Sequence, residues 1–126
     1  MKNIKKSVPV LLSLLIILTT FPLTALATDV TVSDFTQLQS AIDNASGQTN
    51  IIVGNNIAFT GMITIPEGKD IAIISSGNNN YTLSLAAAGY RHFTVSANSV
   101  LTLGNITLDG VYNGSYTSRR GGGIIN

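Results

Sequence analysis

The chain contains no cysteine, so disulfide bonds and thiolate metal sites are both excluded. It contains one histidine, His92, so a metal site built on several imidazoles is excluded as well. Charged residues make up only 10% of the 126 residues, against roughly 25% in an ordinary globular domain. Asparagine, threonine, serine and glycine supply the polarity instead, which suits a surface made of stacked turns.

The formal net charge of +1 depends on three lysines near the N-terminus, Lys2, Lys5 and Lys6. The rest of the chain has four basic residues against six acidic ones, so it is slightly acidic. Because no basic patch remains, we do not expect the protein to bind nucleic acid.

Residues 1–27 have the parts of a secretory signal peptide. Lysines are followed by an apolar run, Val8 to Leu18, broken only by Pro9 and Ser13, and then by the small-x-small sequence Ala25-Leu26-Ala27. A retained membrane anchor is the alternative, but the run is shorter than the roughly 20 residues that a span needs. We expect cleavage after Ala27, a secreted or cell-surface location, and membrane contact only through this signal peptide.

Residues 28–48 are expected to form an N-terminal cap, a short strand followed by an amphipathic helix over 34–45. The helix is predicted from apolar residues at helical spacing, which are Phe35, Leu38, Ala41, Ile42 and Ala45. Ser33 is the expected N-cap and Gly47 the expected C-terminal stop. The polar face carries no lysine or arginine, which favours a lid over a stack of strands rather than a membrane-surface helix.

Residues 49–126 contain short apolar pairs that alternate with polar residues. In the segment Arg91–Gly110, for example, three such strands follow one another with turns of a few residues. Ile52, Ile73 and Phe93 lie about 20 residues apart, which suits a solenoid. The pattern therefore predicts an all-β fold, a parallel β-helix of two to three rungs. A small antiparallel β-sandwich is the alternative.

Several segments carry a resemblance to a known family. They are Val30–Ile42, Ile63–Ile73, His92–Val95, Leu101–Gly110 and Arg120–Asn126. Together they resemble the start of secreted right-handed parallel β-helix proteins of the pectate-lyase-like superfamily. The resemblance is greatest to bacterial surface adhesins and polymorphic outer-membrane-type proteins. In that family the Gly-Gly-x-Ile segment usually opens further coils, whereas this chain stops at Asn126. We therefore expect an apparently truncated stack whose open end needs further rungs or a partner chain.

The same resemblance implies what an enzyme of this superfamily would carry, namely an arginine base and aspartate clusters that hold calcium. Here Arg91 is the one arginine within a rung, and Asp70 and Asp109 are isolated. No pair of carboxylates lies on any predicted strand, so we predict no catalytic residue, no cofactor-binding residue and no metal ligand. Enzymatic activity is left open, with a non-enzymatic role favoured.

Two tyrosines, Tyr112 and Tyr116, are the candidate ligand-binding residues. They flank Asn-Gly-Ser in a loop that leaves the predicted stack, and aromatic rings on such loops can stack on sugars. A turn with scattered tyrosines is the alternative. His92 is expected at the surface or at a corner, because Phe93 and Val95 should point inwards.

The sequence therefore favours a secreted or cell-surface β-helix protein with a structural or adhesin-like role. Its expected partner is cell-surface or extracellular polysaccharide, or matrix, bound weakly at many points. One alternative is the N-terminal part of a polysaccharide lyase or hydrolase whose catalytic rungs lie beyond Asn126. A third hypothesis is a degenerate fragment without a function of its own.

Overall fold

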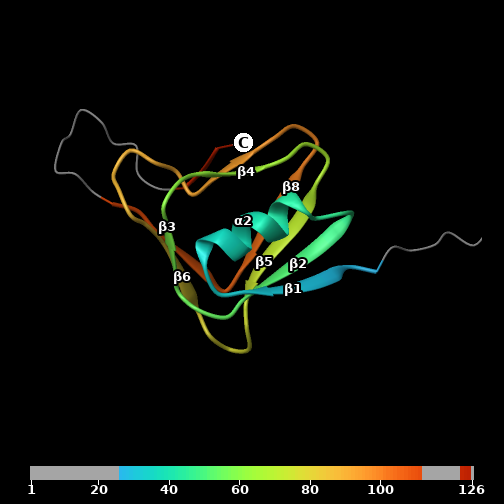
Figure 1. Ribbon diagram of the computed structural model, residues 1–126, viewed down its shortest axis with the longest axis horizontal. Helices are drawn as coiled ribbons and strands as arrows, with labels where there is room; N and C mark the ends of the chain where they lie inside the picture. Colours follow the sequence, from blue (N-terminus) through green and yellow to red (C-terminus); the bar gives the residue numbers. More distant parts are fainter. Residues whose placement is uncertain (1–25, 112–122, 126) are drawn as a thin grey trace, which may run out of the picture.

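The computed structural model describes residues 26–111 and 123–125. Most of the predicted signal peptide therefore lies outside the described residues, and so do Tyr112 and Tyr116. The elements in chain order are β1 (Thr28–Val32), α2 (Phe35–Asp43), β2 (Gln48–Val53), β3 (Ile57–Phe59), β4 (Ile63–Ile65), β5 (Asp70–Ser75), β6 (Tyr81–Leu85), β7 (Phe93–Val95), β8 (Val100–Gly104), β9 (Ile106–Asp109) and β10 (Ile124–Ile125) (Figure 1).

The strands form three sheets, and every strand pair in the described ranges is parallel. The sheets have the orders β1-β2-β5-β8, β3-β6-β9 and β10-β7-β4. The chain visits them in the same sequence each time, so we call β2 to β4 the first pass, β5 to β7 the second and β8 to β10 the third. The antiparallel sandwich is wrong for these strands, and an all-β fold of parallel sheets is confirmed.

The core lies between the three sheets, because each strand points alternate residues inwards. In β2, β3 and β4 the inward positions are buried and their neighbours are more exposed. The fully buried residues of the first two passes are mostly isoleucine, leucine and phenylalanine: Ile51, Ile57, Phe59, Ile63, Ile65, Ile71, Ile73, Leu83 and Phe93. The alternation seen in the sequence therefore identifies the inward face correctly.

The spacing between stacked residues differs from the sequence-based prediction. Ile51 pairs with Ile73, 22 residues later, whereas Ile73 pairs with Leu103, 30 residues later. Phe93 pairs with Ile63 in another sheet, so the predicted row of Ile52, Ile73 and Phe93 at a period of about 20 is wrong. The spacing varies because turns of unequal length connect the strands, so the number of residues between two stacked positions differs from one pass to the next.

Helix α2 covers one end of the core, as the predicted lid should. Figure 1 shows α2 lying across the space between the sheets, with β4, β3 and β1 around it. Its apolar stripe faces inwards: Leu38 and Ile42 are fully buried, Ala41 and Ala45 are nearly so, and Phe35 packs against the core. In the described part of the chain, no helix has both the length and the hydropathy that a membrane crossing requires.

The helix ends differ slightly from the predicted ones. Asp34, and not Ser33, is the N-cap residue, since its Oδ1 accepts a hydrogen bond from the Gln37 backbone N at 2.8 Å. Ser33 instead donates from its backbone N to the Gln37 side-chain oxygen at 2.9 Å. The helix stops at Asp43 with Asn44 as its C-cap, before Gly47, which has a φ of 70° in the following turn.

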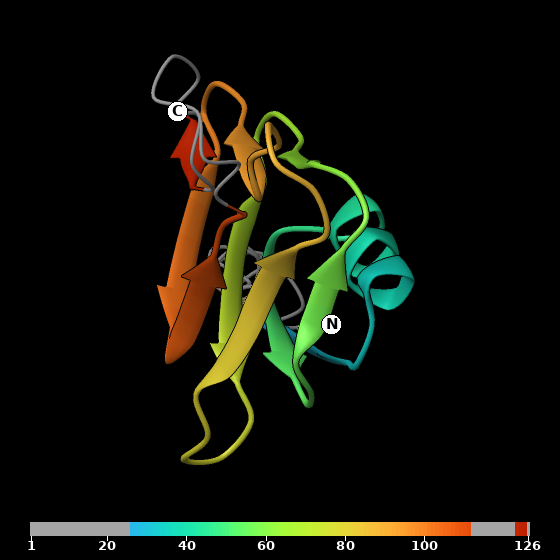
Figure 2. The same ribbon diagram turned by 90° about the vertical axis from the view of Figure 1, so that its left-hand side faces the viewer.

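The other end of the stack is formed by the third pass. Figure 2 shows β8 and β9, in orange, at the end of the molecule opposite α2. Among the described strands they are the outermost members of their sheets. Their inward residues, which are Leu101, Leu103, Ile106 and Leu108, pack against the core but stay partly exposed.

Candidate functional site

A groove of about 370 Å³ lies between β1 and α2. Its walls come from β1, from α2 and the turn after it, and from the start of β2. The lining residues are Thr28, Val30, Thr31, Val32, Gln37, Ser40, Ala41, Asn44, Ala45, Ser46 and Thr49. The volume falls at the lower end of the range of roughly 300–1,000 Å³ that is usual for small-molecule pockets.

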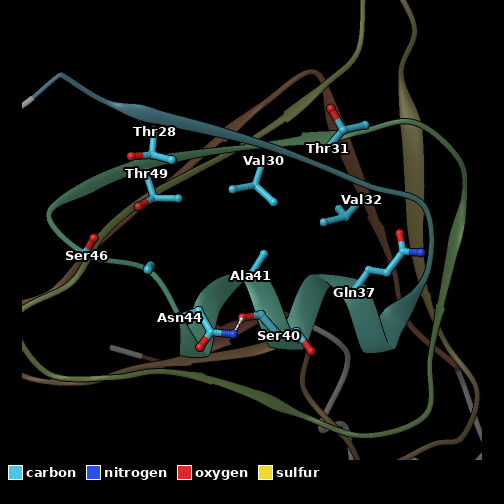
Figure 3. A pocket seen from close by; sticks show the side chains of 11 residues that line it. Thr28, Val30, Thr31, Val32, Gln37, Ser40, Ala41, Asn44, Ser46 and Thr49 are labelled. Carbon is cyan, nitrogen blue, oxygen red and sulfur yellow. Dashed lines mark hydrogen bonds between the residues drawn. The ribbon is translucent and has the colours of Figure 1, made fainter.

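The groove exists because small residues of α2 and of the turn after it look towards β1. Leu38 and Ile42 reach down into the core, whereas Ala41 and Ala45 each present only a methyl group to the strand. Val30 and Val32 form the opposite wall (Figure 3). Two alanines facing two valines therefore leave a space that larger side chains would fill.

Polar groups lie at both ends of the groove, and Ser40 and Asn44 lie along its helix side next to the apolar Ala41. Figure 3 shows Thr28, Thr49 and Ser46 gathered at one end, and Gln37 at the other, with Ala41 and Val30 between them. None of the eleven lining residues carries a charge. The groove therefore offers hydroxyl and amide hydrogen bonds beside a short aliphatic wall.

Thr49 differs from every other lining residue, because it is buried with an unsatisfied hydroxyl. It is 1% exposed, and its Oγ1 has no hydrogen-bond partner within the described residues. By contrast Ser75, another inward hydroxyl of the same sheet, accepts from the Tyr81 backbone N at 2.9 Å and donates to the Asn105 carbonyl at 2.6 Å. A buried hydroxyl without a partner costs roughly 1–3 kcal/mol, so Thr49 is the costly feature of this region.

The helix end beside the groove is held by two contacts. Asn44 donates from its side chain to the Ser40 carbonyl at 2.8 Å, and the Lys69 ammonium donates to the Ala45 carbonyl. A cation at this position also complements the negative end of the helix dipole. The groove wall contributed by α2 is therefore fixed at its C-terminal end.

His92 is the third polar side chain that the structure buries, after Thr49 and Ser75. It was predicted at the surface or at a corner; it lies at a corner, but the predicted outward orientation is wrong. The residue is fully buried, and its Nε2 lies 2.8 Å from the Leu83 carbonyl oxygen. Its ring packs edge-on against Phe59, with the ring centroids 5.2 Å apart. His92 comes just before β7, at a corner where the strand alternation does not yet apply, so both His92 and Phe93 point inwards.

Burial lowers the pKa of His92 below its ordinary value of 6.5, and this effect outweighs the opposing influence of the Leu83 carbonyl and of Asp109. The Nδ1 atom has no hydrogen-bond partner among the described residues. A neutral imidazole inside an aromatic cluster, without access to solvent, fits a role in packing better than one in proton transfer.

The other residues weighed from the sequence do not come together. Asp70 lies in register with Gln48 and Val100, and Asp109 with Ser84, so neither carboxylate faces another. Within residues 26–111 and 123–125, no group of three histidine, aspartate or glutamate side chains could hold a metal ion. The candidate tyrosines, Tyr112 and Tyr116, lie outside the described residues, so their role stays a prediction.

The groove was missed by the sequence-based reasoning. The signal that could have indicated it is the pair Ala41 and Ala45, which puts small residues on one side of an otherwise large apolar stripe. Comparison of the chain with protein-family models, with curated proteins and with solved structures gives no match.

Proposed function

We propose that this chain is a secreted or cell-surface parallel β-helix protein, right-handed as in the pectate-lyase-like superfamily, with a structural or adhesin-like role. In this proposal the three passes are the first coils of the helix, residues 28–48 are its cap, and the signal peptide is cleaved after Ala27 on export. The first strand begins at Thr28, so cleavage there would leave it intact.

The observation that supports a surface-binding role is the polar outer face of the sheet β3-β6-β9. Thr82 of β6 stands in register with Thr107 of β9, and Ser84 stands in register with Asp109. Adjacent strands lie about 4.8 Å apart, so the hydroxyls of Thr82 and Thr107 are neighbours across the sheet, whereas Ser84 lies between Ala58 and Asp109. Polar side chains on neighbouring parallel strands suit weak contacts with a repeating polymer such as a polysaccharide.

Asparagine side chains hold this face in place. The Asn56 side-chain oxygen accepts a hydrogen bond from the Thr82 backbone N at 2.9 Å, which ties the first pass to the second. Thr107 donates its hydroxyl to the Asn80 side-chain oxygen at 3.2 Å, which ties the second to the third. Ordered rows lose less conformational entropy on binding than mobile side chains do.

The test is retention of the full chain on insoluble polysaccharides, measured by co-sedimentation. We expect the double variant Thr82→Val and Thr107→Val, which keeps the β-branched shape but removes both hydroxyls, to reduce the bound fraction at least threefold. The matched control is Thr64→Val with Thr94→Val, a register pair on the other three-stranded sheet. Equal retention of both double variants would reject this face as the binding surface.

A further inference from the structure

We propose that the groove between β1 and α2 binds a small uncharged molecule that has an aliphatic body and one hydroxyl or amide group. This site is separate from the polysaccharide-binding face proposed above, and it needs no polymer. Three properties of the groove lead to this ligand class: the absence of charged lining residues, the aliphatic wall, and the buried Thr49 hydroxyl without a hydrogen-bond partner.

The first property is the charge of the lining. All eleven lining residues are neutral, including the hydroxyl-bearing Thr28, Ser40, Ser46 and Thr49. A charged ligand would leave its hydration shell without gaining an opposite charge, which is costly in a confined site. In the full chain, where Thr28 is not the N-terminal residue, the groove therefore selects against carboxylates, phosphates and amines.

The second property is the wall. Val30, Val32, Ala41 and Ala45 line the middle of the groove with aliphatic groups, and no lining residue is aromatic. Sugars bear hydroxyls around the whole ring and are commonly held against aromatic faces, as the expectation for Tyr112 and Tyr116 assumed. An aliphatic chain complements this wall better, because each buried methylene group contributes favourably by leaving water.

The third property is the hydroxyl of Thr49 at the polar end of the groove. Its Oγ1 is buried without a partner, although the Thr49 side chain lines the groove. Rotation about the Cα–Cβ bond by one staggered step moves the hydroxyl of a threonine to the place of its methyl group and the methyl group to the place of the β-hydrogen. A ligand hydroxyl or amide at this end would then satisfy a polar group that lacks a partner in the free protein.

The experiment uses the full chain and a series of straight-chain primary alcohols, from 1-butanol to 1-octanol. Binding is followed by the NMR shifts of the methyl groups of Val30, Val32 and Ala41. We expect saturable shifts confined to the groove, with an affinity that rises about fourfold per added methylene and then levels off when the groove is full. The methyl groups of Leu101 and Leu103, at the opposite end of the stack, serve as the internal reference.

Two variants separate the wall from the hydroxyl. Ala41→Leu keeps a strong helix former and fills the groove, so binding should be lost. Thr49→Val keeps the side-chain shape and removes the hydroxyl, so 1-hexanol should bind about tenfold more weakly while its methyl ether is less affected. Thr64→Val, an exposed position on β4, is the matched control and should bind as the unchanged chain does.

Several outcomes would overturn the proposal. One is the absence of saturable shifts in the groove, and another is equal binding by the Ala41→Leu variant that folds normally. Larger shifts with a neutral disaccharide or with a short uncharged peptide than with any alcohol would replace the proposed ligand class. None of these results bears on retention by polysaccharides, so the two proposals can fail independently.

Discussion

The two ends of the stack use the same sequence pattern but reach different degrees of burial. At the end covered by α2, the inward residues of the first pass, such as Ile51 and Ile63, are fully buried. In the third pass, Leu103 and Leu108 occupy equivalent inward positions and remain partly exposed. Alternation of polar and apolar residues therefore decides which face a side chain joins, and the layer beyond it decides how much water the side chain loses.

The largest expected effect compares two residues that are partners in register. Ile73→Ala should lower the free energy of unfolding by about 4 kcal/mol, since it leaves a cavity in a closed core. Leu103→Ala, one strand further out, should cost about 1–2 kcal/mol because its side chain is already partly exposed. Urea denaturation of the full chain measures both values.

The control for this pair is Thr102→Ala, an exposed position on the same strand as Leu103, which should change stability by less than about 0.5 kcal/mol. Equal losses for the Ile73 and Leu103 variants would contradict the comparison. They would mean that the third pass is covered in solution as fully as the second.

The second prediction concerns His92, which lies just before β7 of the second pass and is buried in the core. Because its folded pKa is lowered by burial, the unfolded chain binds a proton at about pH 6.5 that the folded chain does not yet bind. The stability that comes from keeping His92 neutral and buried is thus fully present above pH 6.5, and it is lost as the pH falls towards the pKa of His92 in the folded chain. The slope for one proton is at most about 1.4 kcal/mol per pH unit.

The measurement is urea denaturation at several pH values for the unchanged chain and for His92→Gln, which does not titrate and retains an amide donor for the Leu83 carbonyl. We expect the unchanged chain to lose more stability than the variant between pH 7 and pH 5. Identical pH dependence in the two chains would show that His92 is not held neutral in the folded state.

The third prediction tests the capped end. Asp34→Ala should lower stability by about 1 kcal/mol, because the Gln37 backbone N loses its acceptor. Ser33→Ala should cost only a few tenths of a kcal/mol, since the Ser33 hydroxyl bonds only to an exposed Gln37 side chain. Thermal melting of the two variants distinguishes them. A larger loss of stability for Ser33→Ala than for Asp34→Ala would contradict this assignment and indicate that Ser33 is the N-cap.

The smallest expected effect lies at Gly104, on the outermost strand of its sheet. A Cβ there would meet the Ile74 side chain at 3.4 Å, an ordinary contact, so Gly104→Ala should stabilise the chain by about 0.5 kcal/mol. Gly68→Ala is the matched control, and it should be destabilising because Gly68 has a φ of +74° in a turn. If Gly104→Ala is destabilising as well, then the packing around Gly104 has no room for a methyl group, and β8 is packed more tightly than its partly exposed side chains indicate.

Much of this fold follows from local pattern alone. Period-two alternation predicts the strands, and helical spacing over residues 35–45 predicts the lid. The register does not follow, because the turn between β2 and β3 is far shorter than the segment between β6 and β7. Nothing in the alternation marks which strand pairs with which when the intervening turns differ so much.

The candidate site was harder to predict than the fold. The groove depends on Ala41 facing Val30 across space, a relation between two elements and not within one. The burial of His92 was missed because alternation was extended one residue beyond the start of β7. Such corner positions obey the geometry of the turn, and so the sequence pattern gives no direct indication of where their side chains point.

The parallel register also has a consequence for how the chain acquires its structure. Paired residues are separated by only 21 to 31 positions along the chain, from Thr28 with Thr49 to Phe93 with Ile124. This separation stays within that range for every pair, and because loop-closure entropy depends only weakly on length, each new pass closes a loop of similar entropic cost. A chain that emerges N-terminus first can assemble the lid with β1 and β2 from its first 53 residues. That nucleus then serves as the template on which β5 and β8 add in the same sheet, one neighbour at a time.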